Sequence, residues 1–153
     1  MSGSYDSLRL NGEESNVDSL GTFIAWLAAN NMLADSLENA SGSSIARLRM
    51  QDLAGADFLA TVMHGEFKVE HLADKARKFV EDYFVSGSYE ADFNAAEQKF
   101  LEGRSVERNV ENAWLLYDEV SPFISQAFHS FSHPPSKARV TIAKILQFPG
   151  RKR

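Results

Sequence analysis

Cysteine is missing from the 153 residues of this chain. Its absence excludes disulfide frameworks, thiol catalysis and cysteine-ligated zinc, and it favours the reducing cytoplasm as the compartment. Long hydrophobic runs are missing too, because the longest apolar stretches, residues 23–29 and 115–117, fall far short of the roughly 18 residues that span a bilayer. Residues 1–16 lack the basic region and apolar core of a secretory signal. We therefore expect a cytoplasmic protein without a membrane span.

The sequence motifs of several enzyme classes are also absent. The chain contains neither the G-x-x-x-x-G-K-[ST] loop nor the G-x-G-x-x-G turn that cradle phosphates, and no serine lies in a G-x-S-x-G elbow. Carboxylates are numerous, but neighbouring acids on a helix point in different directions, and an acidic surface needs no catalytic explanation. The sequence thus predicts no catalytic residue, no metal ligand and no cofactor, and we expect the chain not to be an enzyme.

One cluster of residues has the composition of a metal site. It comprises His64, Glu66, Glu70 and His71. The spacing matches neither H-E-x-x-H nor another pattern that places two ligands on one helical face, and Gly65 inside the cluster indicates a turn. We favour a helix cap followed by solvated charges, with a metal site as the open alternative.

The charges are divided unequally along the chain. Residues 1–136 carry ten basic and twenty-one acidic side chains, a net charge of −11, whereas residues 137–153 carry six basic side chains and no acidic one. Such a division indicates electrostatic association rather than a catalytic pocket. The basic segment allows three interpretations: a solubilising tail, a segment that docks on the acidic body, or a contact for nucleic acid or anionic lipid. Phe148 is the one aromatic residue among these bases, which argues against nucleic acid.

Apolar residues recur with helical spacing along most of the chain. The first set runs from Leu20 to Leu27 at the i, i+3, i+4 and i+7 positions of one helical face, and the longest runs from Val110 to Phe131. Because proline removes a backbone donor and is tolerated in a first helical turn, Ser121 and Pro122 predict that this longest helix kinks or restarts there, with Ser121 as the N-cap.

Two shorter patterns complete the secondary structure. Asp35 followed by Glu38 has the spacing of a capping box, which predicts the start of a short helix. Residues 66–71 alternate between charged and less polar side chains, which is typical of a short extended segment. We predict an all-α fold: a compact multi-helix bundle of short helical hairpins, with one such extended segment.

The domain organisation follows from these patterns. Residues 1–16 have no periodicity and are expected to form a mobile leader. Residues 17–133 are expected to form the helical domain. Residues 134–153 are expected to form a basic C-terminal segment that is helical and partly mobile.

Five short motifs occur in order along the helical part. They are F-I-A-W-L at 23–27, G-A-D-F-L at 55–59, H-G-E-F at 64–67 with Leu72, Y-F at 83–84 before Y-E-A-D-F at 89–93, and V-E-N-A-W-L-L-Y-D at 110–118. In these motifs the chain resembles a small helical bacterial domain family of unknown function, over about residues 17–131. Some members look like companions, or immunity proteins, of polymorphic toxins, so the resemblance implies an interaction role. Asp57, Asp92 and Asp118 accompany the motifs, as structural caps or as a shared polar site.

These observations lead to a functional hypothesis with two alternatives. The leading one is a non-enzymatic immunity protein that covers the active site of a basic toxin domain, because the acidic body suits such a partner. One alternative is a small metal- or carboxylate-dependent hydrolase or transferase that uses the histidine cluster or the three aspartates. The other is a regulatory adaptor with a basic tail. The oligomeric state stays open. The predicted docking residues are Glu81, Asp82, Glu90, Asp92, Glu97, Glu107 and Glu111.

Overall fold

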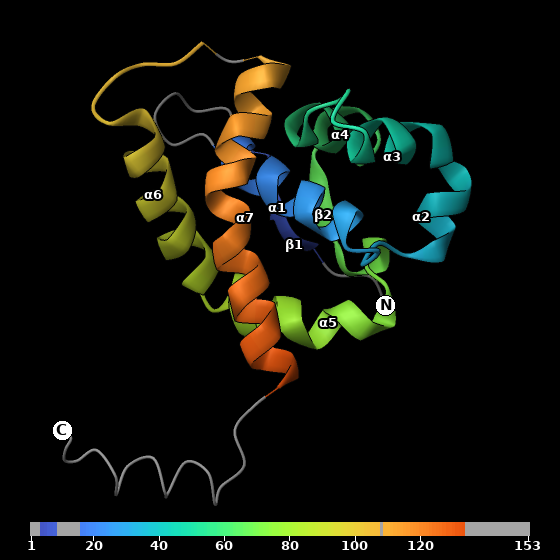
Figure 1. The fold of residues 1–153 in the computed structure, drawn as a ribbon. Helices are drawn as coiled ribbons and strands as arrows, with labels where there is room; N and C mark the ends of the chain where they lie inside the picture. The colour runs from blue at the N-terminus through green and yellow to red at the C-terminus, as the bar shows by residue number, and fades with distance from the viewer. Residues whose placement is uncertain (1–3, 9–15, 108, 134–153) are drawn as a thin grey trace, which may run out of the picture.

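The computed structural model describes residues 4–8, 16–107 and 109–133. These residues form seven α-helices and a two-stranded antiparallel sheet (Figure 1), which confirms the predicted all-α class. No helix in the described ranges combines the length and the apolar character needed to cross a membrane. The elements are, in chain order, β1 (Ser4–Ser7), α1 (Val17–Ala29), α2 (Asp35–Ala40), α3 (Gly42–Arg49), α4 (Gly55–Thr61), β2 (Glu66–Lys68), the 3₁₀ turn η2 (Val69–His71), α5 (Asp74–Val80), the π-helical turn η3 (Glu81–Val85), α6 (Ser88–Leu101) and α7 (Val110–Ser132).

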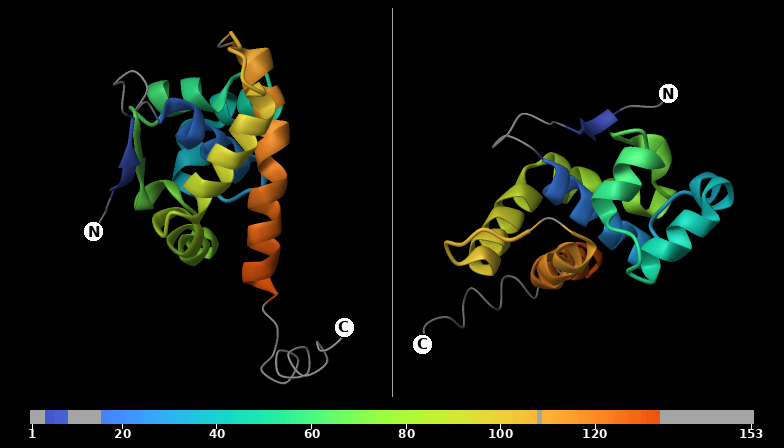
Figure 2. Two further views of the ribbon diagram at one scale, coloured as in Figure 1. Left: turned by 90° about the vertical axis from the view of Figure 1, so that its left-hand side faces the viewer. Right: turned by 90° about the horizontal axis from the view of Figure 1, so that it is seen from above.

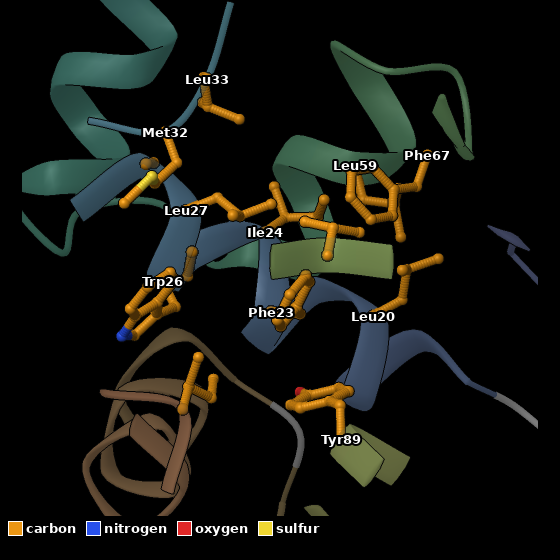
Figure 3. Packing of buried hydrophobic residues seen from close by; sticks show 14 of the residues in the cluster. Leu20, Phe23, Ile24, Trp26, Leu27, Met32, Leu33, Leu59, Phe67 and Tyr89 are labelled. Carbon is orange, nitrogen blue, oxygen red and sulfur yellow. The ribbon is translucent and has the colours of Figure 1, made fainter. Parts of the chain in front are cut away.

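Helix α1 is the centre of the core. Every residue from Leu20 to Ala28 is buried, so the helix is covered on all sides and not along one stripe. Its sequence permits this, because that stretch contains no charged side chain and a helix that is hydrophobic all round is a buried helix. Figure 3 shows Phe23, Ile24 and Leu27 of α1 among side chains from several other elements. The other helices are therefore arranged around α1.

The contact between α1 and α4 is made by two glycines. A Cβ on Gly21 would lie 2.5 Å from the backbone nitrogen of Ala56, and a Cβ on Gly55 would collide with the carbonyl oxygen of Gly21. The two backbones therefore touch directly, and no larger residue fits at either position. Because α4 begins at Gly55, this contact fixes where the helical hairpins of α2 to α4 join the core.

Helix α7 crosses the molecule in front of α1, between α6 and the hairpins of α2 to α4 (Figure 1). It runs unbroken from Val110 to Ser132, so the helix does not restart at Pro122 and Ser121 is not an N-cap; of the two predicted outcomes, a kink or a restart, the restart is wrong. Pro122 is exposed, and Val120 and Ile124 on either side of it are fully buried. A proline inside a helix costs about 3 kcal/mol, whereas burying two aliphatic side chains stabilises by roughly 1.5–3 kcal/mol each. Tertiary packing thus keeps the helix continuous.

The sheet lies on the side of α1 opposite α7 (Figure 2). β2 confirms the predicted extended segment, although it ends at Lys68, where η2 begins. Its partner β1 comes from the segment expected to be a mobile leader. That expectation missed the contact of the Tyr5 ring with Phe67, whose centroids are 5.1 Å apart. Residues 9–15 of the leader and the basic segment 134–153 lie outside the described residues.

The predicted capping box at Asp35 and Glu38 is also wrong. Ala34 is the N-cap of α2 and makes no side-chain hydrogen bond, while the carboxylate of Glu38 pairs with Arg49 at 3.0 Å. Nε of Arg49 donates to the carbonyl oxygen of Ala28 at 2.8 Å, which satisfies an acceptor at the C-terminal end of α1. Glu38 therefore helps to tie α3 to α1.

Candidate functional site

The predicted docking residues of α6 lie on two sides of that helix. Glu90 and Glu97 are seven residues apart, which places them on the same side at a separation of roughly 10.5 Å along the axis. Asp92 lies on the other side, where it accepts a hydrogen bond of 2.6 Å from the Tyr83 hydroxyl of η3. The structure therefore keeps Glu90 and Glu97 as neighbours on one surface and gives Asp92 a structural partner.

Glu97 and Glu107 line one hollow of about 90 Å³, together with Asp18. We call it the carboxylate hollow. The three acidic residues come from the first turn of α1, the second half of α6 and the loop before α7. Acidic residues from three separate elements thus line one concave surface.

One edge of the carboxylate hollow is fixed by hydrogen bonds. Asn109 is the N-cap of α7, and its side chain accepts from the backbone N–H of Asn112 at 2.8 Å. The Asn109 amide donates to the carboxylate of Glu107 at 3.0 Å, and the Asn112 amide donates to the Glu107 carbonyl oxygen at 2.7 Å. These bonds orient Glu107 in the loop before α7.

Four apolar side chains also line the carboxylate hollow: Phe100, Leu101, Val106 and Leu116. Acidic and apolar side chains are therefore neighbours on this surface.

The other predicted docking residues lie elsewhere. Glu81 and Asp82 are exposed in η3, before the turn at Gly87 that precedes α6. Glu111 is exposed on the first turn of α7 and lines a shallow concavity with Leu115, away from the carboxylate hollow. The seven residues thus line different parts of the surface, and Glu97 and Glu107 are the two that share the carboxylate hollow.

The histidine cluster does not form a metal site. The backbone N–H of Lys68 donates to Nδ1 of His71 at 2.9 Å, and burial lowers the pKa of His71. Glu66 pairs with the Lys68 ammonium at 3.7 Å, and His64 is exposed in the turn between α4 and β2. Within the part of the chain that the structure describes, no group of three His, Asp or Glu side chains is placed to hold a metal ion.

The three aspartates lie on three different helices. Asp57 is exposed on α4, and Asp92 bonds to Tyr83 beside α6. Asp118 is exposed on α7, next to Tyr117. Burial, followed by the charge of Asp118, raises the pKa of Tyr117 to about 12. These contacts suit a structural role for each aspartate better than a shared site.

Tyr89 links α6 to α1 beside the candidate site. Its ring packs on Phe23 with centroids 4.8 Å apart, and its hydroxyl donates to the carbonyl oxygen of Ser19 at 2.5 Å. Burial raises the pKa of Tyr89 well above the usual value for tyrosine. This buried bond fixes α6 against the first turn of α1, from which Asp18 reaches the carboxylate hollow.

The sequence prediction missed Asp18, Asn109 and Asn112. Asn109 and Asn112 carried a detectable signal, because Asn is a preferred N-cap residue and the pair directly precedes the buried face of α7. Asp18 carried none, since an acid in a first helical turn is ordinary. Its place in the site depends on how α1 and α6 meet.

Comparison with known proteins adds the family. No curated protein and no solved structure shows a significant match to the chain. The family model described as a domain of unknown function, DUF7832, matches residues 7–105. The match contains Asp18, Glu90 and Glu97, and it ends before Glu107 and α7. Because it covers more than half of the chain, this protein belongs to the DUF7832 family.

Proposed function

We propose that this protein is a non-enzymatic binding protein of the cytoplasm that docks a basic protein partner against the side of α6 that carries Glu90 and Glu97. The observation that supports the proposal most directly is the net charge of −11 over residues 1–136. On this side of α6, Glu90 is exposed, and Glu97 and Glu107 line one hollow.

The specific form of the proposal is an immunity protein. Such a protein would neutralise a toxin by covering its active site. Two observations support it: the resemblance of the five motifs to helical domains that accompany polymorphic toxins, and the net charge of −11 over residues 1–136. Toxins that act on nucleic acids have basic surfaces, and complementary charge accelerates the encounter of two proteins more than it deepens their affinity.

The first experiment uses the protein encoded beside this chain in the genome. We expect cells that express this neighbour alone to stop growing, and cells that express both proteins to survive. The tagged chain should also retain the neighbour during purification. A neighbour that is toxic, but neither binds the chain nor is neutralised by it, would refute the immunity role.

A second experiment tests the docking side. The triple variant Glu90→Gln, Glu97→Gln, Glu107→Gln removes three negative charges from one side of the molecule. We expect the association rate with the partner, measured by stopped flow or biosensor at 0.1 M salt, to fall about tenfold. Glu90 and Glu107 are exposed and Glu97 is half-buried. Gln keeps the shape of each side chain and a carbonyl oxygen that can accept a hydrogen bond, so the thermal midpoint should change little.

A matched control separates the docking side from net charge. The triple variant Asp57→Asn, Glu70→Gln, Asp118→Asn removes the same number of charges from exposed positions outside the carboxylate hollow. It should slow association by less than about twofold, because long-range attraction is screened beyond roughly 10 Å at 0.1 M salt. Equal effects of the two triple variants would mean that the partner senses only the total charge and does not dock at α6.

A further inference from the structure

Large apolar side chains stay exposed along helix α7. Leu115 is 48% exposed, Phe123, eight residues later, is 43% exposed, and Phe131, after another eight residues, is 36% exposed. Together with Glu119 and Ala127 they form one i, i+4 row, which is a ridge on the helix surface. We call it the α7 ridge. In both views of Figure 2, no described element lies on the side of α7 that faces away from α1. An exposed apolar row with polar neighbours marks a surface on which another segment or molecule packs.

The N-terminal half of the α7 ridge is acidic. Glu111, Asp118 and Glu119 each lie three or four residues from Leu115, so all three surround it on the helix surface. Helix α7 contains no Lys and no Arg, and the ion pairs among the described residues include none of these three carboxylates. An occupant that complements this surface therefore combines apolar side chains with positive charge.

The C-terminal segment of the same chain has this combination. Residues 137–153 carry six basic side chains and no acidic one. Four apolar residues of the segment recur at i, i+4, i+7 and i+8, which is the spacing of one helical face. They are Ala138, Ile142, Ile145 and Leu146. Lys137 and Lys144 fall on the opposite side of the same helical pattern. The sequence of the segment thus complements the α7 ridge in apolar character and in charge.

The connection between α7 and this segment is short. Helix α7 ends at Ser132, and the helical pattern begins at Lys137, so only residues 133–136 separate them. Pro134 and Pro135 among these residues do not continue a helix. Two helices joined by a loop of about two to five residues form an antiparallel hairpin. The loop length therefore favours a return of the segment along α7.

We infer that residues 137–153 of this chain fold back on the α7 ridge and cover it. In a hairpin with its loop at residues 133–136, Ala138 comes level with Phe131 and Leu146 with Phe123. A helix over residues 137–148 is about 18 Å long, and extended residues 149–153 add roughly 16 Å, whereas α7 measures about 26 Å from Ser132 back to Leu115. The last three bases of the segment therefore reach the acidic half of the ridge.

The apolar contact carries most of this interaction, because ion pairs between exposed side chains stabilise little. The charges contribute the direction, since an antiparallel return places the basic end of the segment beside the acidic N-terminal half of α7. With its own segment on the α7 ridge, the chain leaves the α6 side as the acidic surface that is open to a partner. The inference does not depend on that partner.

The direct test locates the segment with a spin label. Because the chain has no cysteine, Gln147→Cys allows a nitroxide to be attached at a single site of the full ¹⁵N-labelled chain. We expect strong paramagnetic broadening of the amides of residues 115–123. The amides of α2, which lies at the opposite edge of the molecule from α6 (Figure 1), should broaden little. Equal broadening of α7 and α2, or no broadening of either, would overturn the inference.

A mixed sample decides between this chain and a second copy as the occupant. It contains the ¹⁵N-labelled chain without a nitroxide and the spin-labelled chain without ¹⁵N. We expect no selective broadening of residues 115–123 in the mixture, because each ridge is covered by its own segment. Selective broadening there would mean that the segment docks on another copy, and it would overturn the intramolecular contact.

Variants of α7 connect the contact to the ridge. Trypsin cleavage after Lys144 should be slower in the full chain than in a synthetic peptide of residues 134–153, since cleavage follows the population of the undocked segment. Leu115→Gln with Phe123→Gln should accelerate it about tenfold. The triple variant Glu111→Gln, Asp118→Asn, Glu119→Gln should accelerate it about two- to threefold at low salt, because exposed ion pairs contribute less.

The matched control removes three exposed carboxylates outside α7, as Asp35→Asn, Asp57→Asn and Glu70→Gln. It should leave the cleavage rate unchanged. Native-chain cleavage as fast as that of the peptide, or equal rates in the two charge variants, would overturn the inference. The charge variants leave the apolar residues in place, so they remain informative even if the double variant disturbs folding. None of these measurements involves a partner, so they decide on the segment even where the proposed docking function fails.

Discussion

Helix α1 meets two of its neighbours in opposite ways. Against α4 the contact is backbone on backbone, because Gly21 and Gly55 leave no space for a side chain. Against α6 the contact is made by side chains, with Phe23 on the Tyr89 ring and the Tyr89 hydroxyl on Ser19, and the carboxylate hollow lies beside it. The α4 side cannot adjust to a new group, whereas the α6 side already offers concave polar space. We therefore expect the α4 side to determine stability and the α6 side to determine binding.

The largest effect should come from closing the glycine contact. Gly55→Ala places a methyl group against the Gly21 carbonyl, and since neither backbone can yield without moving a helix, we expect a loss of about 3 kcal/mol or more in the free energy of unfolding, measured in urea. Gly42→Ala is the control. Gly42 lies at the start of α3, and a Cβ there would meet no atom within 4 Å. This variant should gain about 0.5–1 kcal/mol, and a similar loss in both variants would contradict the steric explanation.

The sequence predicts those features of the fold that depend on neighbouring residues, and it fails where contacts with residues distant in the sequence determine the structure. The helical stripes of α1 and α7 were recognisable because burial repeats with the helical period. Pro122 misled the prediction because the local penalty is visible in the sequence, whereas the packing of Val120 and Ile124 that outweighs it is not. Glu38 misled it for the same reason, since its partner Arg49 comes from the next helix.

The candidate site was less predictable than the fold. Composition indicated an acidic surface, and Glu97 and Glu107 were selected from it, but nothing in the sequence shows that they converge with Asp18. Asp92 belonged to the same acidic group and instead has its carboxylate held by Tyr83. Charge identifies the type of surface, while helix packing decides which charges meet.

The second-largest effect should come from alkaline pH, which should lower the free energy of unfolding through the buried tyrosines. Burial, assisted by Asp92, raises the pKa of Tyr83, burial raises that of Tyr89, and burial with the charge of Asp118 raises that of Tyr117 to about 12. The unfolded chain releases these protons near pH 10, whereas the folded chain retains them, so the stabilisation is complete below pH 10 and falls as the pH rises above it. For Tyr117 this loss is complete above about pH 12. We expect the free energy of unfolding to fall by up to about 1.4 kcal/mol per pH unit for each tyrosine that stays protonated.

The measurement is urea unfolding between pH 9 and pH 12 in steps, with tyrosinate absorbance recorded in parallel. Tyr117 lies outside the contact of α1 with α6. Tyr117→Phe should therefore reduce the slope of the free energy of unfolding against pH only by the contribution of that one tyrosine. If the tyrosines of the folded chain ionised near pH 10, and stability did not change up to pH 12, the buried hydroxyl groups would not be what stabilises this side.

The smallest expected change in stability comes from removing the hydroxyl group of one of two tyrosines, Tyr89 of α6 or Tyr5 of β1. The Tyr89 hydroxyl donates to Ser19, whereas the Tyr5 hydroxyl is buried without a hydrogen-bond partner among the described residues. Tyr89→Phe removes a bond and should cost about 1 kcal/mol, while Tyr5→Phe removes an unsatisfied buried group and should be neutral or stabilise by up to about 1 kcal/mol. Both changes delete one oxygen and keep the ring, so urea unfolding at pH 7 isolates the hydrogen bond. A loss of equal size in both variants would mean that ring packing alone joins α6 to α1, and that the Tyr89 hydrogen bond adds no stability to this contact.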